Sequence, residues 1–204
     1  MTHAAERAKV GVLDPTRART REDLVTAIEA GANPRWLMFW GHRPKADGSP
    51  GPHLLSQWWP CRFTAGGVAY ASAEHWMMAE KARLFDDTAS LERILAAPTP
   101  AEAKNLGRLV ENFDEAVWNA ARLEAVVTGN VAKFGQDPVL RAYLLGTANR
   151  VLVEASPRDR IWGIGLAATN DHASDPRLWR GSNLLGFALM ETRDRLTLSD
   201  SAAG

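Results

Sequence analysis

Cysteine is nearly absent from this chain, because Cys61 is the only one among its 204 residues. A single thiol excludes an intramolecular disulfide and a zinc cluster built on cysteines, and low cysteine use is typical of reducing compartments. Long apolar runs are missing as well. No segment approaches the roughly 18 apolar residues of a membrane-spanning helix, and the N-terminus lacks the apolar stretch of a signal peptide. We therefore expect a cytoplasmic protein with no membrane partner.

An excess of charge of one sign is also lacking. Lysine and arginine total 24, aspartate and glutamate total 24, and the formal net charge is zero. Without a positive field over the whole molecule, a protein held on a long polyanion by phosphate contacts is disfavoured, although a local basic pocket remains compatible with one nucleotide phosphate. No metal-ligand spacing relates His42, His53, His75 and His172. We therefore expect no metal site and no cofactor.

Hydrophobic residues, by contrast, make up 46% of the chain, and tryptophan occurs eight times. This content suffices for the core of one domain of ordinary size. A surplus of tryptophan indicates either a thick core or an aromatic binding cleft. We expect a flexible arm at residues 1–19, one domain at residues 20–198 that includes a short N-terminal helical extension, and a tail at residues 199–204.

Capping and turn residues predict where the helices and strands of this domain lie. A last amphipathic helix is expected over residues 182–196, and the others are expected to begin after Thr20, Ser72, Thr99, Asp114 and Asp137. A strand is expected at residues 35–41, a strand pair at the turn through Gly66 and Gly67, and a strand, turn and strand over residues 150–167. The sequence therefore predicts a single α+β domain, mostly helical, with a small β-sheet.

The stretch "YASAEHWMMAEKARLF", residues 70–85, places Glu74 and Lys81 in one of the predicted helices. Residues i, i+4 and i+7 share a helix face, so Glu74, Met78 and Lys81 form one stripe. Glu74 either stabilises the first turn through the helix dipole, or it points into a cleft walled by aromatic residues. In such a cleft a partly desolvated carboxylate acts as a general base or stabilises a cation. Spacing alone leaves both interpretations open.

Four blocks of residues, in order along the chain, carry a more specific pattern. The first is "LLSQWWPCRFTAGGVAYASAEHWMMAEKA", and the others are "VWNAARLEAVVTGNVAKF", "DRIWGIGL" and "GSNLLGFALMETRDRL". Together they cover residues from about 36 to 196 and resemble the NADAR family, which is also called YbiA-like. The resemblance implies the fold of that family and an N-glycosidase activity, directed at early riboflavin intermediates in some members and at ADP-ribosylated guanine in others.

The resemblance also implies a set of site residues. The matching candidates for catalysis are Glu74, Lys81 and Asp159, and those for substrate binding are Trp118, Trp162 and Asn183. We add three further binding candidates. Gly163 permits close approach of the backbone to a ligand, Arg43 would donate hydrogen bonds to a phosphate, and Trp40 is the third. The expected partner is a small ribosylated nucleotide, or ADP-ribosylated nucleic acid whose base is flipped into the site.

These residue types suit the cleavage of an N-glycosidic bond. The reaction builds positive charge on the sugar, so a carboxylate at Glu74 would lower the barrier. The rings of Trp118 and Trp162 would stack on the leaving base, and Lys81 would bind a phosphate, pair with Glu74 or protonate the base. Purely structural roles remain the alternative for three of these residues: Trp118 and Trp162 as core residues, and Asp159 as a turn cap.

The sequence departs from the family pattern at Gln57, Glu80 and Ile164. Ile164 stands where one branch of the family carries an aspartate that is proposed to act in the reaction. This change keeps a second hypothesis open, in which the protein is a module that senses ADP-ribose or a related nucleotide without turnover. Glu74 and Lys81 argue against it, because a pure binder of anions has little use for a carboxylate in its pocket.

Overall fold

The computed structural model describes residues 13–203, so most of the expected arm, residues 1–12, lies outside the described part of the chain. The described residues form seven α-helices and four short strands. The helices are α1 Arg21–Glu29, α2 Ala73–Leu84, α3 Thr88–Ala96, α4 Pro100–Gly107, α5 Glu115–Gln136, α6 Pro138–Leu145 and α7 Leu184–Ala203. The strands are β1 Arg35–Phe39, β2 Phe63–Ala65, β3 Val68–Tyr70 and β4 Arg150–Glu154. The expectation of a mostly helical α+β domain is confirmed.

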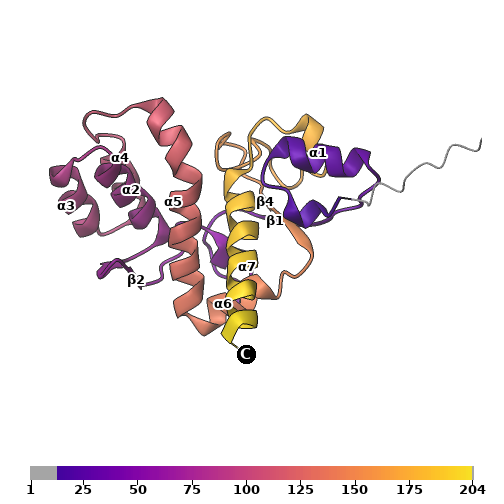
Figure 1. Ribbon diagram of the computed structural model, residues 1–204, viewed down its shortest axis with the longest axis horizontal. Coiled ribbons are helices and arrows are strands. Elements are labelled where there is room, and N and C mark those ends of the chain that lie inside the picture. The colour runs from indigo at the N-terminus through magenta and orange to yellow at the C-terminus, as the bar shows by residue number, and fades with distance from the viewer. Residues whose placement is uncertain (1–12, 204) are drawn as a thin grey trace, which may run out of the picture.

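The two longest helices, α5 and α7, run side by side through the middle of the molecule (Figure 1). Helices α2, α3 and α4 lie on one side of this pair, and α1 with strands β1 and β4 lies on the other. The helix α7 contributes Phe187, Leu189 and Met190 to the core, and all three are fully buried. Burial of such large side chains is the main favourable contribution to the stability of the fold.

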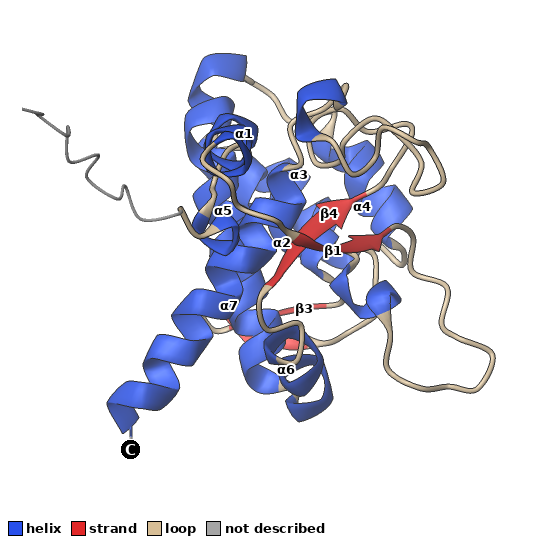
Figure 2. Cartoon of the chain, turned by 90° about the vertical axis from the view of Figure 1, so that its right-hand side faces the viewer, coloured by secondary structure: helices blue, strands red, loops and turns tan. Residues whose placement is uncertain are grey.

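The strands β1 and β4 pair in parallel, with Phe39 opposite Glu154 at their carboxyl ends (Figure 2). Val151, Leu152 and Val153 of β4 are completely buried, as is typical of a strand covered on both faces. The chain between the two strands contains α2 to α6, so this pairing joins segments that are far apart in the sequence. Trp40 and Glu154 therefore lie at the same edge, where the carboxyl ends of parallel strands commonly face a ligand.

Helix starts and the hairpin were predicted correctly from local chemistry. The side chains of the expected capping residues each accept a hydrogen bond from a backbone N–H in the first turn of their helix, at Thr20, Ser72, Thr99, Asp114 and Asp137. Between β2 and β3, Gly66 and Gly67 have φ angles of +58° and +77°, which glycine adopts without steric cost. The expected strand pair is therefore present.

The second strand expected within residues 150–167 is wrong. After β4 the chain forms a series of turns, because the Asp159 side chain accepts hydrogen bonds from the backbone of Ile161 and Trp162. Gly165 then adopts a φ of +68°, which breaks any extended run. Helix α3 was not predicted at all, although Asp87 caps it in the usual way.

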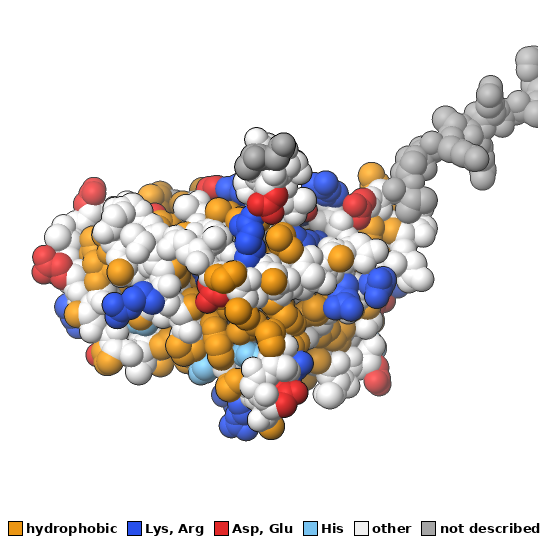
Figure 3. Space-filling model, turned by 90° about the horizontal axis from the view of Figure 1, so that it is seen from below, with side chains coloured by type: hydrophobic (Ala, Val, Ile, Leu, Met, Phe, Trp, Pro, Cys, Tyr) orange, Lys and Arg blue, Asp and Glu red, His pale blue; other side chains and the backbone are white. Residues whose placement is uncertain are grey.

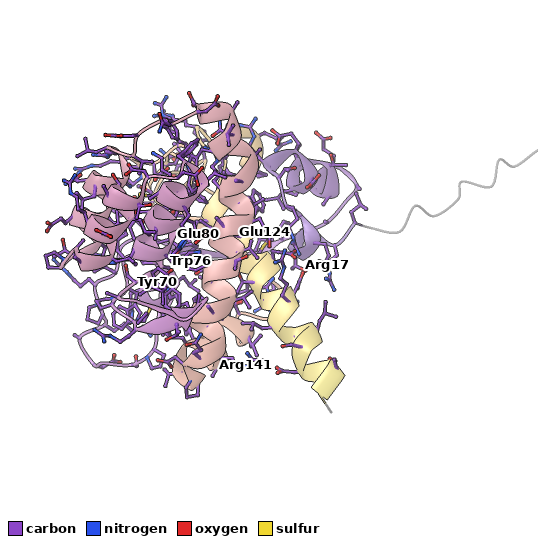
Figure 4. All side chains as sticks on the ribbon, turned by 60° about the vertical axis from the view of Figure 1, so that its left-hand side comes forward. Arg17, Tyr70, Trp76, Glu80, Glu124 and Arg141 are labelled. Atoms are coloured by element: carbon purple, nitrogen blue, oxygen red, sulfur yellow. The ribbon has the colours of Figure 1, made fainter. Side chains whose placement is uncertain are left out.

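Both ends of the described chain involve the helix α7. Residues 13–19 contain a 3₁₀ turn at Pro15–Arg17 and contact α7, because Arg19 binds Glu191 at 2.7 Å and Arg17 binds Asp194 at 3.0 Å (Figure 4). At the other end, α7 continues through Ala203 into the expected tail. Thr197 and Ser201 extend this helix with side-chain bonds to its own backbone carbonyls.

The surface carries charges of both signs without one dominant field. In the view of Figure 3, hydrophobic side chains gather in the centre of one face, and Lys, Arg, Asp and Glu are scattered around them. Among residues 13–203, no helix is both long enough and apolar enough to cross a membrane.

Candidate active site

Glu74 lies in the first turn of α2 and is almost completely buried. Its side chain is 2% exposed, and its Oε1 atom has no hydrogen-bond partner among the described residues. The backbone N–H of Glu74 donates to the carbonyl of Gln57 at 3.0 Å, which ties the helix start to the preceding loop. Burial raises the pKa of Glu74 to about 7, although Lys104 and Trp58 act in the opposite direction. At neutral pH this carboxyl group is therefore close to half protonated.

Glu154, the last residue of β4, supplies a second carboxyl group: the residue is half-buried, and its Oε2 atom is fully buried. Its Oε2 atom also has no partner within the described part of the chain. The pKa of Glu154 is raised to about 8, mainly by burial and in addition by the charges of Asp159 and Glu74. Because the two groups repel each other when both are ionised, we treat Glu74 and Glu154 as one coupled pair that holds at least one proton at neutral pH.

Asp159 caps a turn, and its charge also acts on the two carboxyl groups. Its Oδ1 atom accepts hydrogen bonds from the N–H groups of Ile161 at 2.9 Å and Trp162 at 2.8 Å, so it caps the turn. Its negative charge also raises the pKa of Glu74 and of Glu154. The turn therefore carries a third carboxylate to the edge of the site.

Cationic groups approach these carboxyls from α4 and α5. Lys104 of α4 lowers the pKa of Glu74 and Glu154, and its Nζ lies 5.9 Å from the centroid of the Trp58 ring. Arg122 of α5 has a buried Nε with no partner among the described residues. Burial lowers the pKa of the Arg122 guanidinium, and the charge of Asp159 opposes this shift.

Four of these polar groups share an unusual state: each has a buried atom with no protein partner. They come from four separate segments of the chain, as Gln57 Oε1, Glu74 Oε1, Arg122 Nε and Glu154 Oε2. Buried polar atoms without partners are rare in native proteins, because each one costs about 1–3 kcal/mol. A cluster of such groups is typical of a functional site whose hydrogen bonds are completed by a ligand.

Lys81, expected in the site, makes other contacts. Its Nζ donates to the carbonyl of Gly107 at 2.8 Å and lies 3.9 Å from the ring centroid of Phe113. These contacts join α2 to the end of α4 and to the loop before α5. Burial lowers the pKa of the Lys81 ammonium.

Trp118 lies on α5 and lines a cavity of about 580 Å³ between α2 and α5, together with Trp76, Glu80 and Glu124. Figure 4 labels Trp76 and Glu80 close together on α2, beside α5. Glu74 does not line this cavity. The structure therefore does not bring Trp118 together with the buried carboxyl pair.

Asn183 and Gly163 hold the site in shape. The Asn183 Nδ2 donates to the Leu152 carbonyl at 3.0 Å, and its Oδ1 accepts from the N–H of Glu154 at 2.9 Å. At Gly163, a Cβ atom would lie 2.9 Å from the Glu154 carbonyl oxygen and 3.0 Å from that of Asp159, so only glycine fits. Both residues therefore position Glu154.

The remaining candidates, Trp40, Arg43 and Trp162, differ in exposure. Trp40 is 58% exposed and follows β1 directly, at the same edge as Glu154. Arg43 is exposed in the loop after it, and Trp162 is half-buried against the core. Ile164 is completely buried among core residues, so the departure from the family pattern there removes a carboxylate and adds core packing.

We expect Asn183→Ala to lower the free energy of unfolding by about 2–4 kcal/mol, because the buried Leu152 carbonyl and Glu154 N–H both lose their partner. Urea unfolding measures this change, and Asn105→Ala on the exposed face of α4 is the control. A raised KM with unchanged stability would show instead that Asn183 contacts the substrate.

Sequence reasoning missed Glu154, Lys104, Trp58 and Arg122 as site residues. Arg122 stands within the block "VWNAARLEAVV", so the motif held a signal for it. Glu154 ends an apolar strand, and its importance follows only from the parallel pairing with β1. No group of three or more His, Cys, Asp or Glu side chains is arranged to hold a metal ion anywhere in residues 13–203.

The fold and the site together define a small α+β protein in which Glu74 and Glu154, two carboxyl groups of raised pKa, lie near the carboxyl edge of a two-stranded sheet. The family model of the NADAR domain matches residues 38–197. The solved NMR structure of YbiA from Escherichia coli is similar, with a TM-score of 0.62 and 26% sequence identity, and the match covers 80% of this chain and 86% of that one. The chain belongs to the NADAR family.

Curated relatives agree with this assignment. An N-glycosidase of Acanthamoeba polyphaga mimivirus is 42% identical over 149 residues, which is 71% of this chain and 88% of the viral protein. The N-glycosidase YbiA of Escherichia coli is 31% identical over 69% of this chain and 78% of its own length. A riboflavin biosynthesis protein of Vibrio vulnificus is 32% identical over 70% of this chain but only 35% of that longer protein. The class of this protein is therefore that of hydrolases of N-glycosyl bonds.

Proposed function

We propose that this protein hydrolyses the bond between the C1′ atom of a phosphate-bearing ribose and a nitrogen of a base-like leaving group. The observation that carries the proposal is the buried Glu74–Glu154 pair, whose two unpaired oxygens and raised pKa values suit acid–base chemistry near neutral pH. Relatives that are named N-glycosidases support the same reaction type.

The two carboxyl groups divide the chemistry according to their pKa values. Glu74, with the lower pKa, acts in its ionised form, stabilises the positive charge that develops on the ribose, and takes a proton from the attacking water. Glu154, with the higher pKa, donates its proton to the leaving nitrogen. The C1′–N bond breaks, a C1′–O bond to water forms, and the enzyme returns to its starting protonation after one proton passes between the two groups.

The surrounding side chains suit a phosphoribosyl substrate. The ring of Trp58 beside Glu74 offers a face on which a heterocycle stacks, and Trp40 is exposed at the same edge. Lys104, which lies over the Trp58 ring, supplies a cation for the phosphate. Lys81 was the first candidate for that role, and its bond to Gly107 favours Lys104 instead.

The proposed substrate class is a ribosylaminopyrimidine phosphate of the riboflavin type. Support comes from relatives named riboflavin biosynthesis proteins in Vibrio vulnificus and Zea mays. ADP-ribosylated guanine is the second candidate substrate, because its scissile bond has the same chemistry. The sensor hypothesis loses its main support, since Ile164 belongs to the core and Glu154 provides a second carboxyl group.

We expect kcat/KM to follow a narrow bell with its maximum between about pH 7 and 8. The acid limb reports ionisation of Glu74 near 7, and the alkaline limb reports loss of the Glu154 proton near 8. Initial rates from pH 5 to 9.5 at subsaturating substrate measure the profile. A plateau that extends from pH 5 to 9 would contradict this division of roles.

We expect substitution of Lys104 to affect activity and substitution of Lys81 to affect stability. Lys104→Met should lower kcat/KM about tenfold or more, because a charge-assisted contact to phosphate is worth roughly 1.5–3 kcal/mol. Lys81→Met should leave kcat/KM within a few-fold and lower the melting temperature, because the Gly107 carbonyl loses its donor. Parallel kinetics and thermal melts separate the two. Loss of activity in the Lys81 variant alone would restore Lys81 as the functional cation.

The proposed function is tested with three substrates in single-turnover reactions: a ribosylaminopyrimidine phosphate, ADP-ribosyl-guanine in a short single-stranded DNA, and NAD. Chromatography and mass measurement detect the free base. We expect release from the first substrate, while release from the second alone would assign the other branch. Binding of a substrate with no release of base from any of the three would reject the enzyme and favour the sensor.

A further inference from the structure

The structure contains a polar cavity to whose lining neither Glu74 nor Glu154 contributes. It has a volume of about 280 Å³ and opens between the start of α1 and the turns that follow β4. Its lining includes Arg21, Arg160, Arg180 and Ser182. The α1 segment that closes it, Thr20–Glu22, precedes the region matched by the NADAR domain, so this cavity is an addition to the family domain.

Two of the arginines are held side by side by the backbone. A Cβ atom at Gly165 would lie 2.9 Å from the Cβ of Arg180 and 3.3 Å from the Cγ of Arg160, so both stems pack on this glycine. The N–H of Arg180 donates to the Ile164 carbonyl at 2.9 Å, and the N–H of Ser182 donates to the Arg160 carbonyl at 3.0 Å. The two arginine side chains therefore extend from backbone segments that are fixed by hydrogen bonds.

The charge of this cavity is not balanced. Arg21 pairs with Glu22 at 3.1 Å, and Glu22 is the only acidic residue of the lining. Within residues 13–203, the side chains of Arg160 and Arg180 form no ion pair and no hydrogen bond that the structure records. Arg160 and Arg180 are exposed cations that line the same cavity, and such a local excess of positive charge attracts an anion.

The side chains of Arg160 and Arg180, rather than the N-terminus of α7, would bind such an anion. The first N–H groups of this helix are already used, because Asn183, Leu184 and Leu185 donate to the carbonyls of Gly163, Ile161 and Trp162. The guanidinium groups of Arg160 and Arg180 are free to present planar pairs of donors, which match phosphate oxygens, and the Ser182 hydroxyl lies beside them.

We propose that this cavity is a phosphate-binding site, which takes a phosphate or pyrophosphate group on Arg160 and Arg180. The site does not depend on the proposed hydrolysis, because none of its lining residues belongs to the carboxyl cluster. The same phosphate chemistry has two sources: a free phosphate or nucleotide, or a second phosphate of the substrate itself. Arg160 directly follows Asp159 in the chain, so a phosphate bound at Arg160 is compatible with either source.

The test is calorimetric titration with inorganic pyrophosphate at low ionic strength. Four variants are compared with the wild type: Arg160→Gln with Arg180→Gln, Arg160→Lys with Arg180→Lys, Arg158→Gln as the matched control on the same turn, and Glu74→Gln. We expect Kd to rise at least tenfold in the double glutamine variant and to change less than threefold in the Arg158 and Glu74 variants. The double lysine variant, which keeps the charge, should fall between.

Equal Kd values for the wild type and the double glutamine variant would overturn the site, and so would a wild type that does not bind pyrophosphate at all. Kinetics of the double glutamine variant then identify the source. A raised KM for a diphosphate substrate, with an unchanged KM for a monophosphate one, assigns the site to the substrate. An unchanged KM for both, with pyrophosphate binding lost, assigns it to a separate anion.

Discussion

Glu74→Gln should lower kcat/KM by about 10³-fold or more and, at the same time, make the protein more stable above neutral pH. The loss of activity follows because glutamine can neither stabilise the developing charge on the ribose nor accept a proton from water. The volume of the side chain is kept, so the core around α2 should not rearrange. Single-turnover release of base measures the chemical step directly.

The stability change has a sign that depends on pH. The pKa of Glu74 is raised from 4.5 to about 7 by burial, so between these values the folded state binds more protons than the unfolded state. The free energy of unfolding of the wild type therefore falls as the pH rises through this interval, by up to about 3 kcal/mol. Glutamine carries no charge, so the melting temperatures of the two proteins should be similar at pH 5 and should differ by several degrees at pH 8.

Glu80→Gln is the matched control, because Glu80 is on the same helix, is partly exposed and pairs with Arg83. It should leave the chemical step and its pH dependence unchanged. If Glu74→Gln keeps activity, or if it destabilises the protein equally at pH 5 and pH 8, then Glu74 is a structural residue of the first turn of α2.

Glu154→Gln should lower kcat/KM by about 10²- to 10⁴-fold, because the leaving nitrogen then departs without a proton from the enzyme. The effect should be smaller for a substrate whose base is a better leaving group, since such a base needs less protonation. The pKa of Glu154 is raised from 4.5 to about 8, so the stability gained by the variant relative to the wild type should develop between these pH values and be complete above pH 8. Rates with two substrates of different leaving-group pKa, measured for both proteins, give this comparison.

Glu92→Gln, an exposed change on α3, is the control for this variant. An equal loss of rate for good and poor leaving groups would contradict the role of Glu154 as general acid. It would leave Glu154 as a group that acts only through the pKa of Glu74.

Local chemistry was sufficient to predict most helix starts. A serine, threonine or aspartate that bonds to the first turn needs only its neighbours in sequence, as Ser72 and Asp114 show. The same local logic failed after β4, where a second strand was expected. There the bonds of Asp159 to its own turn and the positive φ of Gly165 decide the conformation.

The site itself could be predicted only in part. Glu74 was found through the family resemblance, and its burial with an unpaired oxygen agrees with a functional role. Glu154 and Lys104 reach it through the pairing of β1 with β4 and the packing of α4 on α2, which join residues far apart in sequence. No residue pattern within one segment records that proximity.

The tryptophans show the same limit. Eight tryptophans occur in the chain, and each of them has a ring that can stack on a base. The sequence does not distinguish which of them borders the site. The structure places Trp58 beside Glu74 and Lys104, while Trp118 lines the separate cavity between α2 and α5. Residue type therefore indicates what a tryptophan can do, and only the packing decides which one borders the carboxyl pair.

The most direct test of the Glu74–Glu154 pair is an NMR titration of the carboxyl carbons in protein labelled with carbon-13 at glutamate. The Glu74→Gln and Glu154→Gln variants assign the two signals. We predict midpoints near pH 7 for Glu74 and near pH 8 for Glu154, and the Glu74→Gln variant should lower the midpoint of Glu154, because the charge of Glu74 raises it. Midpoints near 4.5 for both groups, unaffected by either substitution, would contradict a coupled, buried acid–base pair.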